Sequence, residues 1–202
     1  AKLIETEPGM ELCGELGEGR GAYDLVLKAK PDVILLDLSL KDSSGLELIK
    51  DFRAGDIQCP VLVVSMHDEA LYAERVLKAG ANGYLMKEEA GEKVLEGISV
   101  VLSGELFLSE KMKKELLGRL VGGSSTQSNG RSLKDLTDRE FEIFELIGRG
   151  KSTRVIAEGL SISPKTVDAH RANMKEKLNF TSGAELLRYA VRWIESGMKS
   201  RT

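Results

Sequence analysis

Residues 31–45 read Pro-Asp-Val-Ile-Leu-Leu-Asp-Leu-Ser-Leu-Lys-Asp-Ser-Ser-Gly. The apolar run at 33–36 is short and contains β-branched residues, which predicts a strand buried on both faces of a sheet. Asp37 follows at the carboxyl end of this strand, the edge of an open α/β sheet where ligands bind. An equally open reading is that Asp37 is a polar residue that only ends the strand. The Asp, Ser and Gly residues that close the stretch predict a turn into a helix beginning near Leu46.

Strand and helix patterns alternate through the first half of the chain. Short apolar runs predict further strands at 10–15, 61–65 and 83–86. Amphipathic segments predict helices at 1–5, 19–29, 46–54, 68–78 and 90–103. This alternation is typical of α/β proteins, and it predicts a doubly wound parallel sheet of the flavodoxin type with helices on both faces.

A Gly/Ser-rich segment at 118–133 predicts a flexible linker. It separates a first domain, residues 1–117, from a second domain, residues 134–202. The second domain carries helical patterns at 137–148, 152–160, 163–178 and 182–194. Its third helix begins with Ser163-Pro-Lys-Thr-Val after a tight turn, so the second and third helices together predict a helix-turn-helix.

Composition and charge limit the classes of protein to which this chain can belong. With 42% hydrophobic and 30% charged residues, and no apolar run near the ~20 residues that span a bilayer, the chain is predicted to be globular. Residues 1–117 contain 14 Lys and Arg against 22 Asp and Glu, whereas residues 118–202 contain 15 against 10. This asymmetry indicates that the second half can approach a polyanion. Cys13 and Cys59 are predicted to be buried free thiols, as in a reducing cytoplasm.

Several motifs carry a family resemblance. Asp37, Ser65 and Lys87 each lie at the carboxyl end of a predicted strand, and with Tyr84 they resemble the receiver domain of a two-component response regulator. The whole chain resembles the NarL/LuxR-type subfamily. The segments that carry this resemblance are Ser65-Met-His, Lys78-Ala-Gly-Ala-Asn-Gly-Tyr, Leu136-Thr-Asp-Arg-Glu, Ile156-Ala and Ser163-Pro-Lys-Thr-Val.

The resemblance implies that a sensor histidine kinase phosphorylates Asp37. An acceptor carboxylate needs exposure at a loop edge and a nearby cation, which Lys87 can supply from a neighbouring strand end. Ser65 and Tyr84 would then form the switch that responds to the phosphate, although packing is the favoured explanation for each of them taken alone.

The resemblance also implies a Mg²⁺ site. Family members bind the ion through the acceptor, here Asp37, a backbone carbonyl two residues later, here Ser39, and an acidic pair after the first strand. The chain begins inside what resembles the first helix, so we expect it to be truncated at its N-terminus, without this pair and without the strand expected between residues 10–15 and 33–37. Restoring about 20–25 residues should then restore tight metal binding, rapid phosphorylation and a stable sheet.

For the second domain the resemblance implies double-stranded DNA as the partner. Candidate phosphate contacts are Lys151, Ser152, Lys165, Thr166, His170 and Lys175. Candidate base contacts in the major groove are Asp168, Ala169, Ala172 and Asn173. Asp168 either accepts a hydrogen bond from cytosine or lies on the solvated surface.

Dimerisation is expected on a two-fold DNA site. The last helix carries more apolar residues than a small helical core needs: Leu186, Leu187, Ala190, Trp193 and Ile194. Part of this face is therefore expected to form a homodimer contact. Packing against the first helix of the same domain is the alternative.

These features predict a cytoplasmic, bacterial, DNA-binding transcription regulator controlled by phosphorylation of Asp37. The alternative is a phosphorylation-independent regulator whose receiver serves only as a dimerisation or partner-binding platform. An enzyme of the phosphoaspartyl hydrolase class is not expected, because Ser39 stands where that class needs a second aspartate.

Overall fold

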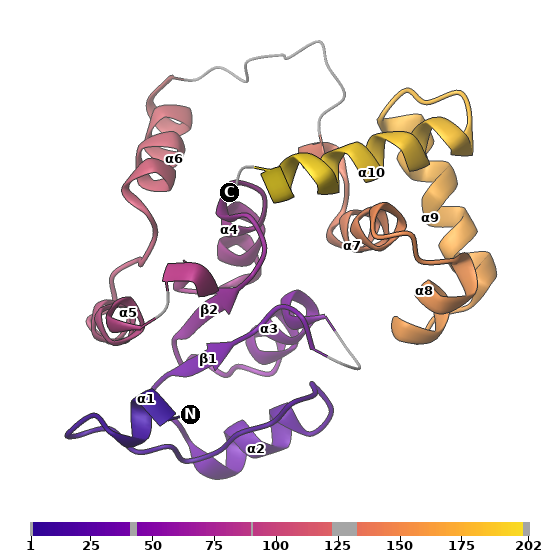
Figure 1. The fold of residues 1–202 in the computed structure, drawn as a ribbon. Helices are drawn as coiled ribbons and strands as arrows, with labels where there is room; N and C mark the ends of the chain where they lie inside the picture. Colours follow the sequence, from indigo (N-terminus) through magenta and orange to yellow (C-terminus); the bar gives the residue numbers. More distant parts are fainter. Residues whose placement is uncertain (1, 41–43, 90, 123–132, 200–202) are drawn as a thin grey trace. The chain divides into compact units, whose positions relative to one another are not determined.

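The computed structural model describes residues 2–40, 44–89, 91–122 and 133–199 (Figure 1). The chain divides into two compact units, Ala1–Gly122 and Gly123–Thr202, which are described separately below. Within the described ranges, no helix combines the length and the apolar character that crossing a bilayer requires.

The described part of the first unit contains a parallel three-stranded sheet in the order β1-β2-β3. Its strands are β1 (Ile34–Leu36), β2 (Val61–Ser65) and β3 (Gly83–Met86). Leu35 pairs with Leu62, and Val63 pairs with Tyr84. These strands lie within the apolar runs at 33–36, 61–65 and 83–86 that predicted them.

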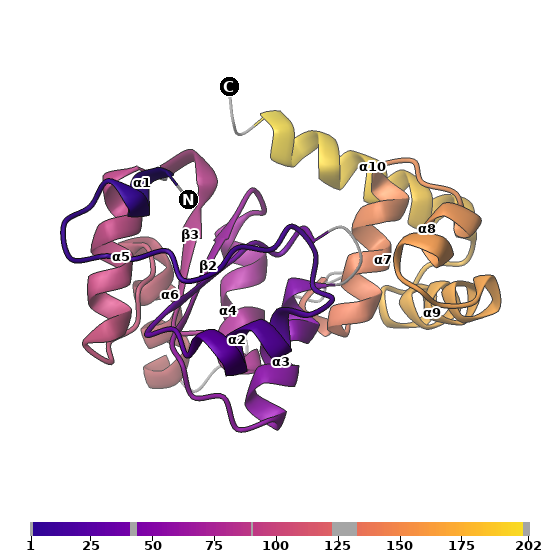
Figure 2. The same cartoon turned by 90° about the horizontal axis from the view of Figure 1, so that it is seen from below.

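Helices surround this sheet. They are α1 (Lys2–Glu5), α2 (Ala22–Ala29), α3 (Gly45–Ala54), α4 (Glu69–Ala79), α5 (Glu92–Leu102) and α6 (Glu110–Gly122), with a short 3-10 helix at Lys87–Glu89. Figure 2 shows α5 on one side of the strands and α4 on the other. Leu62 and Leu85 are buried in a cluster with Ile98 and Val101 of α5. The predicted doubly wound parallel sheet is confirmed.

The first strand differs from its prediction, because it is not buried on both faces. Leu35 is 39% exposed, whereas its neighbour Leu62 on β2 is fully buried. The reason is position in the sheet: β1 is the edge of the described strands, and the α5 cluster covers Leu62 and Leu85 without including Leu35. An apolar run indicates a strand, but it does not indicate how many strands pair with it or how many helices cover it.

The predicted strand at 10–15 is also wrong. These residues are described and contain no strand. A strand forms only where a partner offers a hydrogen-bonding ladder, and no described strand pairs with β1 on the side away from β2. Met10 instead packs at the margin of the α5 cluster.

Helix α6 was not predicted, and it extends to Gly122, five residues into the segment 118–133 that the sequence predicted as a linker. The Ser109 hydroxyl accepts a hydrogen bond from the Met112 N–H, as an N-cap does, and Met112 is 2% exposed. The Ser109 N–H donates to Glu69 of α4, which fixes the start of the helix. Residues 123–132 of the predicted linker lie outside the described residues, and Leu133, its last residue, begins a 3-10 helix.

The two cysteines are free thiols, as predicted, but the prediction that both are buried is wrong. Cys13 is exposed because the segment around it is not part of the sheet. Cys59 is half-buried, its Sγ donates to the Pro31 carbonyl, and burial raises the pKa of its thiol to about 11.

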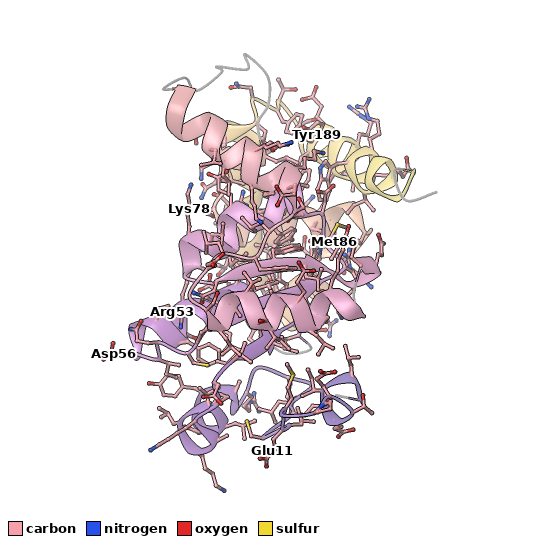
Figure 3. All side chains as sticks on the ribbon, turned by 90° about the vertical axis from the view of Figure 1, so that its left-hand side faces the viewer. Glu11, Arg53, Asp56, Lys78, Met86 and Tyr189 are labelled. Atoms are coloured by element: carbon pink, nitrogen blue, oxygen red, sulfur yellow. The ribbon has the colours of Figure 1, made fainter. Side chains whose placement is uncertain are left out.

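Arg53, labelled in Figure 3, joins the carboxyl ends of α3 and α4. Its guanidinium donates to the carbonyl oxygens of Gly80, Ile57 and Cys59 at 2.5–3.1 Å, and to the side chain of Asn82. The planar guanidinium supplies several donors in fixed directions, which lysine cannot do. Arg53 therefore holds together loops that the sheet alone does not connect.

We expect Arg53→Met to destabilise the first unit by about 2–3 kcal/mol, because three partly buried carbonyls lose their donors. A urea titration followed by circular dichroism measures this, while fluorescence of Trp193, the only tryptophan, reports the second unit, which should not change. Lys78→Met is the control, since Lys78 is 75% exposed and its ion pair with Glu74 lies at the surface. Equal midpoints for the two variants would contradict this role.

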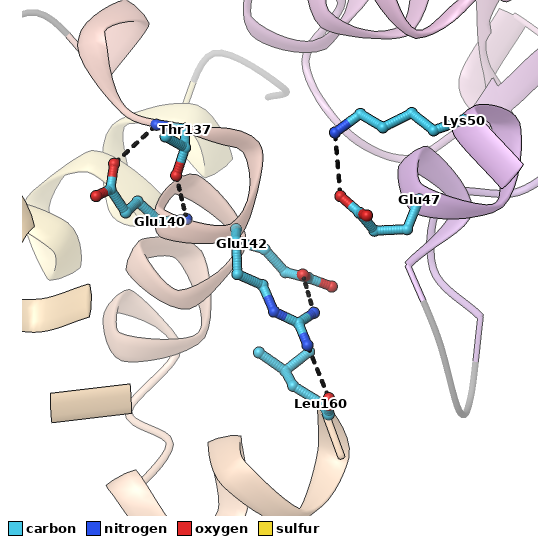
Figure 4. A network of polar contacts seen from close by, with 7 residues as sticks. Glu47, Lys50, Thr137, Glu140, Glu142 and Leu160 are labelled. Carbon is cyan, nitrogen blue, oxygen red and sulfur yellow. Dashed lines mark hydrogen bonds and ion pairs between the residues drawn. The ribbon is translucent and has the colours of Figure 1, made fainter. Parts of the chain in front are cut away.

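The second unit consists of helices in its described part. They are a 3-10 helix at Leu133–Asp135, α7 (Asp138–Gly148), α8 (Thr153–Gly159), α9 (Pro164–Lys177) and α10 (Gly183–Lys199). Thr137 and Glu140 form the predicted capping box of α7 (Figure 4). Ser152 and Ser163 cap α8 and α9. The predicted helix-turn-helix architecture is confirmed.

Helix α10 packs along α7. For most of the apolar face of α10, the structure therefore agrees with the alternative expectation, packing within the domain, and not with a dimer contact. The Trp193 ring lies 5.6 Å and 5.7 Å from the rings of Phe141 and Phe144. Leu186 and Ala190 are fully buried. Leu187 is 42% exposed and does not belong to this core.

Candidate functional sites

The carboxyl ends of the three strands bring Asp37, Ser65 and Lys87 to one edge of the sheet. Asp37 follows β1, Ser65 ends β2, and Lys87 follows β3. The Lys87 Nζ lies 2.5 Å from Asp37 Oδ2, and the two side chains are 38% and 31% exposed. The structure thus joins an accessible carboxylate to a cation across fifty residues of sequence.

The second oxygen of Asp37 is held by its own loop. Oδ1 accepts a hydrogen bond from the Ser39 N–H at 3.0 Å. Gly45, the first residue of α3, lies directly against this loop: a Cβ there would be 2.6 Å from the Asp37 carbonyl oxygen and 2.8 Å from Leu38 Cα. Glycine is therefore required by space, and it lets α3 start beside the carboxylate.

Ser65 and Tyr84 both reach His67. The Ser65 side chain is fully buried, and its Oγ accepts from the His67 N–H at 3.2 Å. Tyr84 is 1% exposed, and its hydroxyl donates to the His67 carbonyl at 2.8 Å. The two predicted switch residues thus meet on one peptide segment, just after β2.

Sequence reasoning missed the role of the His67 side chain. Its Nε2 lies 3.0 Å from Ser39 Oγ, so it connects the loop after β2 with the loop that carries Asp37. The ring also stacks on Tyr72 of α4, with centroids 4.5 Å apart. The available signal was that His67 lies two residues beyond a predicted strand end, the same offset that Ser39 has from Asp37.

The oxygen atoms at this edge suit a hard cation. Asp37 contributes a carboxylate and Ser39 a backbone carbonyl, and Mg²⁺ commonly takes one or two carboxylates and keeps several waters. Among the described residues, no group of three or more His, Cys, Asp or Glu side chains could hold a metal. The residues present fit Mg²⁺ in kind, but they supply few charged ligands.

In the second unit, most predicted DNA contacts lie on accessible surface. Val167 and Met174 of α9 are buried, which leaves the other side of the helix outward. The exposed candidates are Lys151, Ser152, Lys165, Thr166, Asp168, Ala169, Ala172 and Asn173, and the half-buried ones are His170 and Lys175. Asp168 and Lys175 are two helical turns apart, on the same side of α9.

Three hydroxyls near these helix starts are already engaged. Ser152 Oγ accepts from the Val155 N–H, and Ser163 Oγ accepts from the Thr166 N–H. The hydroxyls of Ser163 and Thr166 also lie 2.8 Å apart. Their first role is therefore to form the helix starts.

Two arginines near α8 were not predicted. Arg171 Nη1 of α9 donates to Thr153 Oγ1 at 3.1 Å, which connects the two helices of the motif. Arg154 of α8 is 84% exposed and pairs with Glu158. Its exposed position within the helix-turn-helix could have been read from the α8 pattern.

An ion pair between the buried Glu140 and the part-exposed Lys177 stabilises the start of α7. Glu140 is 2% exposed, and its Oε2 accepts from the Thr137 N–H and from Lys177 Nζ at 2.7 Å. Burial by itself raises the pKa of Glu140, but the hydrogen bonds from Lys177 and Thr137 together lower the pKa below its ordinary value. Lys177 lies at the end of α9, so this pair connects α7 to the helix of the predicted DNA contacts.

Comparison with known families gives two matches along the chain. Residues 1–99 match the response regulator receiver domain, and residues 134–190 match the luxR family of bacterial regulatory proteins. The oxygen regulatory protein NreC of Staphylococcus epidermidis is 34% identical over 194 residues, which cover 94% of this chain and 89% of that protein. The transcriptional regulatory protein DegU of Brevibacillus brevis is 32% identical over 208 residues, covering 96% and 88%.

Solved structures give the same picture of the fold. A LuxR-family response regulator from Aurantimonas is 28% identical with a TM-score of 0.54, over 59% of this chain and 86% of that one. RcsB from Salmonella enterica, bound to a promoter in the presence of a phosphomimetic, has a TM-score of 0.63 at 22% identity, over 94% and 90%. The second likeness concerns fold alone.

Proposed function

Because this chain belongs to the response regulators that combine a receiver domain with a LuxR-type DNA-binding domain, we propose that it binds double-stranded DNA under the control of a phosphoryl group on Asp37. A sensor histidine kinase would supply that group. The observation that carries this proposal is the pairing of an accessible carboxylate, Asp37, with Lys87 at the carboxyl edge of the sheet.

The proposed transfer uses groups already in place. An Asp37 carboxylate oxygen attacks the phosphorus, the bond from phosphorus to the histidine nitrogen of the kinase breaks, and the electron pair stays on that nitrogen. Lys87 neutralises charge that builds up on the phosphoryl oxygens. The Ser39 N–H orients the carboxylate. Mg²⁺, when bound by Asp37 and the Ser39 carbonyl, would add positive charge at the same place.

The proposed response begins at Ser65. Its hydroxyl can turn from the His67 N–H towards a phosphoryl oxygen. Tyr84 is coupled to this change, because its hydroxyl donates to the carbonyl of the same residue, His67.

We assign the receiver to residues 1–117, the linker to 118–133 and the DNA-binding domain to 134–202. We further propose a homodimer as the DNA-binding form, with Leu187 among its contacts, and a regulatory rather than an enzymatic role.

A test of DNA binding uses the full chain and duplex DNA. The affinity is expected to fall steeply with salt, because neutralised phosphates release counterions. Lys165→Ala and Lys175→Ala should each weaken binding to all sequences alike and reduce the salt slope by about one. Asp168→Ala should instead change the preference among sites. Fluorescence anisotropy at several salt concentrations measures all three effects.

Lys78→Ala provides the matched control, since Lys78 is an exposed lysine of the first unit. Its affinity and salt slope should equal those of the wild type. If the lysine variants of α9 bind like this control, the proposed interface is wrong. If the wild type shows no salt-dependent binding even at low ionic strength, the proposed function is wrong.

A further inference from the structure

Three groups of His67 bond to three different segments of the first unit. Its N–H donates to Ser65 at the end of β2, and its carbonyl accepts from Tyr84 of β3. Its ring Nε2 lies 3.0 Å from Ser39 Oγ in the loop after β1. The proposed transfer uses the acceptor and the switch residues, but it gives the ring of His67 no part.

The orientation of this ring is fixed by packing. It stacks on Tyr72 of α4, with centroids 4.5 Å apart and planes inclined by 29°. Such a stack restricts the rotamers of the histidine before any other bond forms. The nitrogen edge of the ring is thereby directed to Ser39, so the bond between them costs little additional conformational entropy.

Ser39 in turn is bonded to the acceptor itself. Its N–H donates to Asp37 Oδ1 at 3.0 Å, while its hydroxyl meets His67. A continuous path of hydrogen bonds therefore runs from Asp37 through Ser39 to His67, and from there to Ser65. The two loops that border the carboxylate are joined by side chains as well as by the sheet.

We propose that His67 is a positioning residue for phosphoryl transfer to Asp37. Its ring holds the loop after β2 against the acceptor loop, so that the Ser65 hydroxyl starts close to the incoming phosphoryl group. Without this bond the loop must be ordered during the transfer, and that entropy cost slows the reaction. The inference rests on the proposed function of Asp37.

Acetyl phosphate with Mg²⁺ is the probe for the test. In this reaction the bond from phosphorus to the acetyl oxygen breaks, acetate leaves with the electron pair, and a bond forms from phosphorus to Asp37. His67→Phe keeps a ring on Tyr72 but removes the nitrogen, and Ser39→Ala removes the hydroxyl while keeping the backbone N–H and carbonyl. Each should slow labelling about fivefold, the effect of losing one side-chain hydrogen bond.

The double variant distinguishes positioning from general damage. If the two side chains act through one bond, His67→Phe with Ser39→Ala should also be about fivefold slower, not the product of both losses. His67→Gln, whose amide nitrogen can reach Ser39, should recover most of the rate. A purely structural role would lower the melting temperature of the variants without this non-additivity.

Nuclear magnetic resonance of the imidazole nitrogens gives a readout that does not depend on labelling. The chain has two histidines, so a His170→Gln variant assigns the His67 signals. Ser39→Ala should shift the His67 Nε2 resonance and leave His170 unchanged. An unshifted resonance would contradict the bond.

The outcomes separate the two proposals. A wild type that takes no label at Asp37 overturns the proposed function and this inference with it. A labelled wild type whose two variants react at the wild-type rate, react faster, or lose rate multiplicatively overturns the role of His67 alone.

Discussion

Replacing Asp37 with asparagine is expected to abolish phosphoryl incorporation. The amide is isosteric, so the loop and the Ser39 contact at Oδ1 can persist, but the nucleophilic carboxylate is lost. Lys87→Met should keep the acceptor and slow labelling by about 10²-fold, since one donor to the developing charge is removed. Intact-mass measurement after incubation with acetyl phosphate and Mg²⁺ gives both rates.

Asp32→Asn is the matched control, because this exposed carboxylate precedes the same strand at its opposite end. It should label like the wild type. Label that persists in Asp37→Asn would show that another residue is the acceptor. Label that appears as expected but leaves DNA affinity unchanged would favour the alternative in which the receiver is only a platform.

Breaking the Glu140–Lys177 pair is expected to destabilise the second unit strongly. Glu140→Ala removes the buried carboxylate that accepts from the part-exposed Lys177 and supplies one half of the capping box, at a cost of about 2 kcal/mol. Glu140→Gln keeps the cap and loses the charge, so it should cost about half as much. Urea titration followed by Trp193 fluorescence measures the loss, because the indole contacts Phe141 and Phe144 of α7.

The same carboxylate predicts a pH dependence. Its pKa is lower in the folded unit than its ordinary value of 4.5, so the folded unit binds this proton less well than the unfolded chain does. The stabilisation is therefore fully present above about pH 4.5 and is lost as the pH falls through the lowered value. Glu140→Gln should remove this part of the acid sensitivity.

Glu158→Gln serves as the control for both measurements, because Glu158 is 64% exposed in its pair with Arg154. Its stability should stay within about 0.5 kcal/mol of the wild type at every pH. If Glu140→Gln and Glu158→Gln have the same unfolding midpoints, the Glu140–Lys177 pair contributes nothing measurable.

Much of the fold follows from signals that are local in sequence. The run at 61–65 is a strand because it is apolar and β-branched, and Thr137 starts a helix because Glu140 is three residues away. Asp37 and Lys87 were matched because parallel strands end at the same edge. Those features depend on neighbours in the chain, or on a rule that applies to every parallel sheet.

Other features depend on contacts that sequence periodicity does not encode. The exposure of Leu35 reflects its place at the edge of the described strands, and the segment 10–15 needs a strand partner to become a strand itself. Helix α6 is fixed at its start by Glu69, forty residues earlier. The His67–Ser39 bond likewise joins two loops through side chains that carry no motif of their own.

The contact between Gly45 and the Asp37 carbonyl has a consequence for how the site can change. A single added methyl group would separate α3 from the acceptor loop, although every side chain that performs chemistry would remain in the sequence. A search for the motif residues alone would still identify such a variant as an intact receiver. Function at this edge therefore depends on the space beside the Gly45 Cα as much as on the charges of the site. A descendant of this protein keeps the site only if no side chain occupies that space.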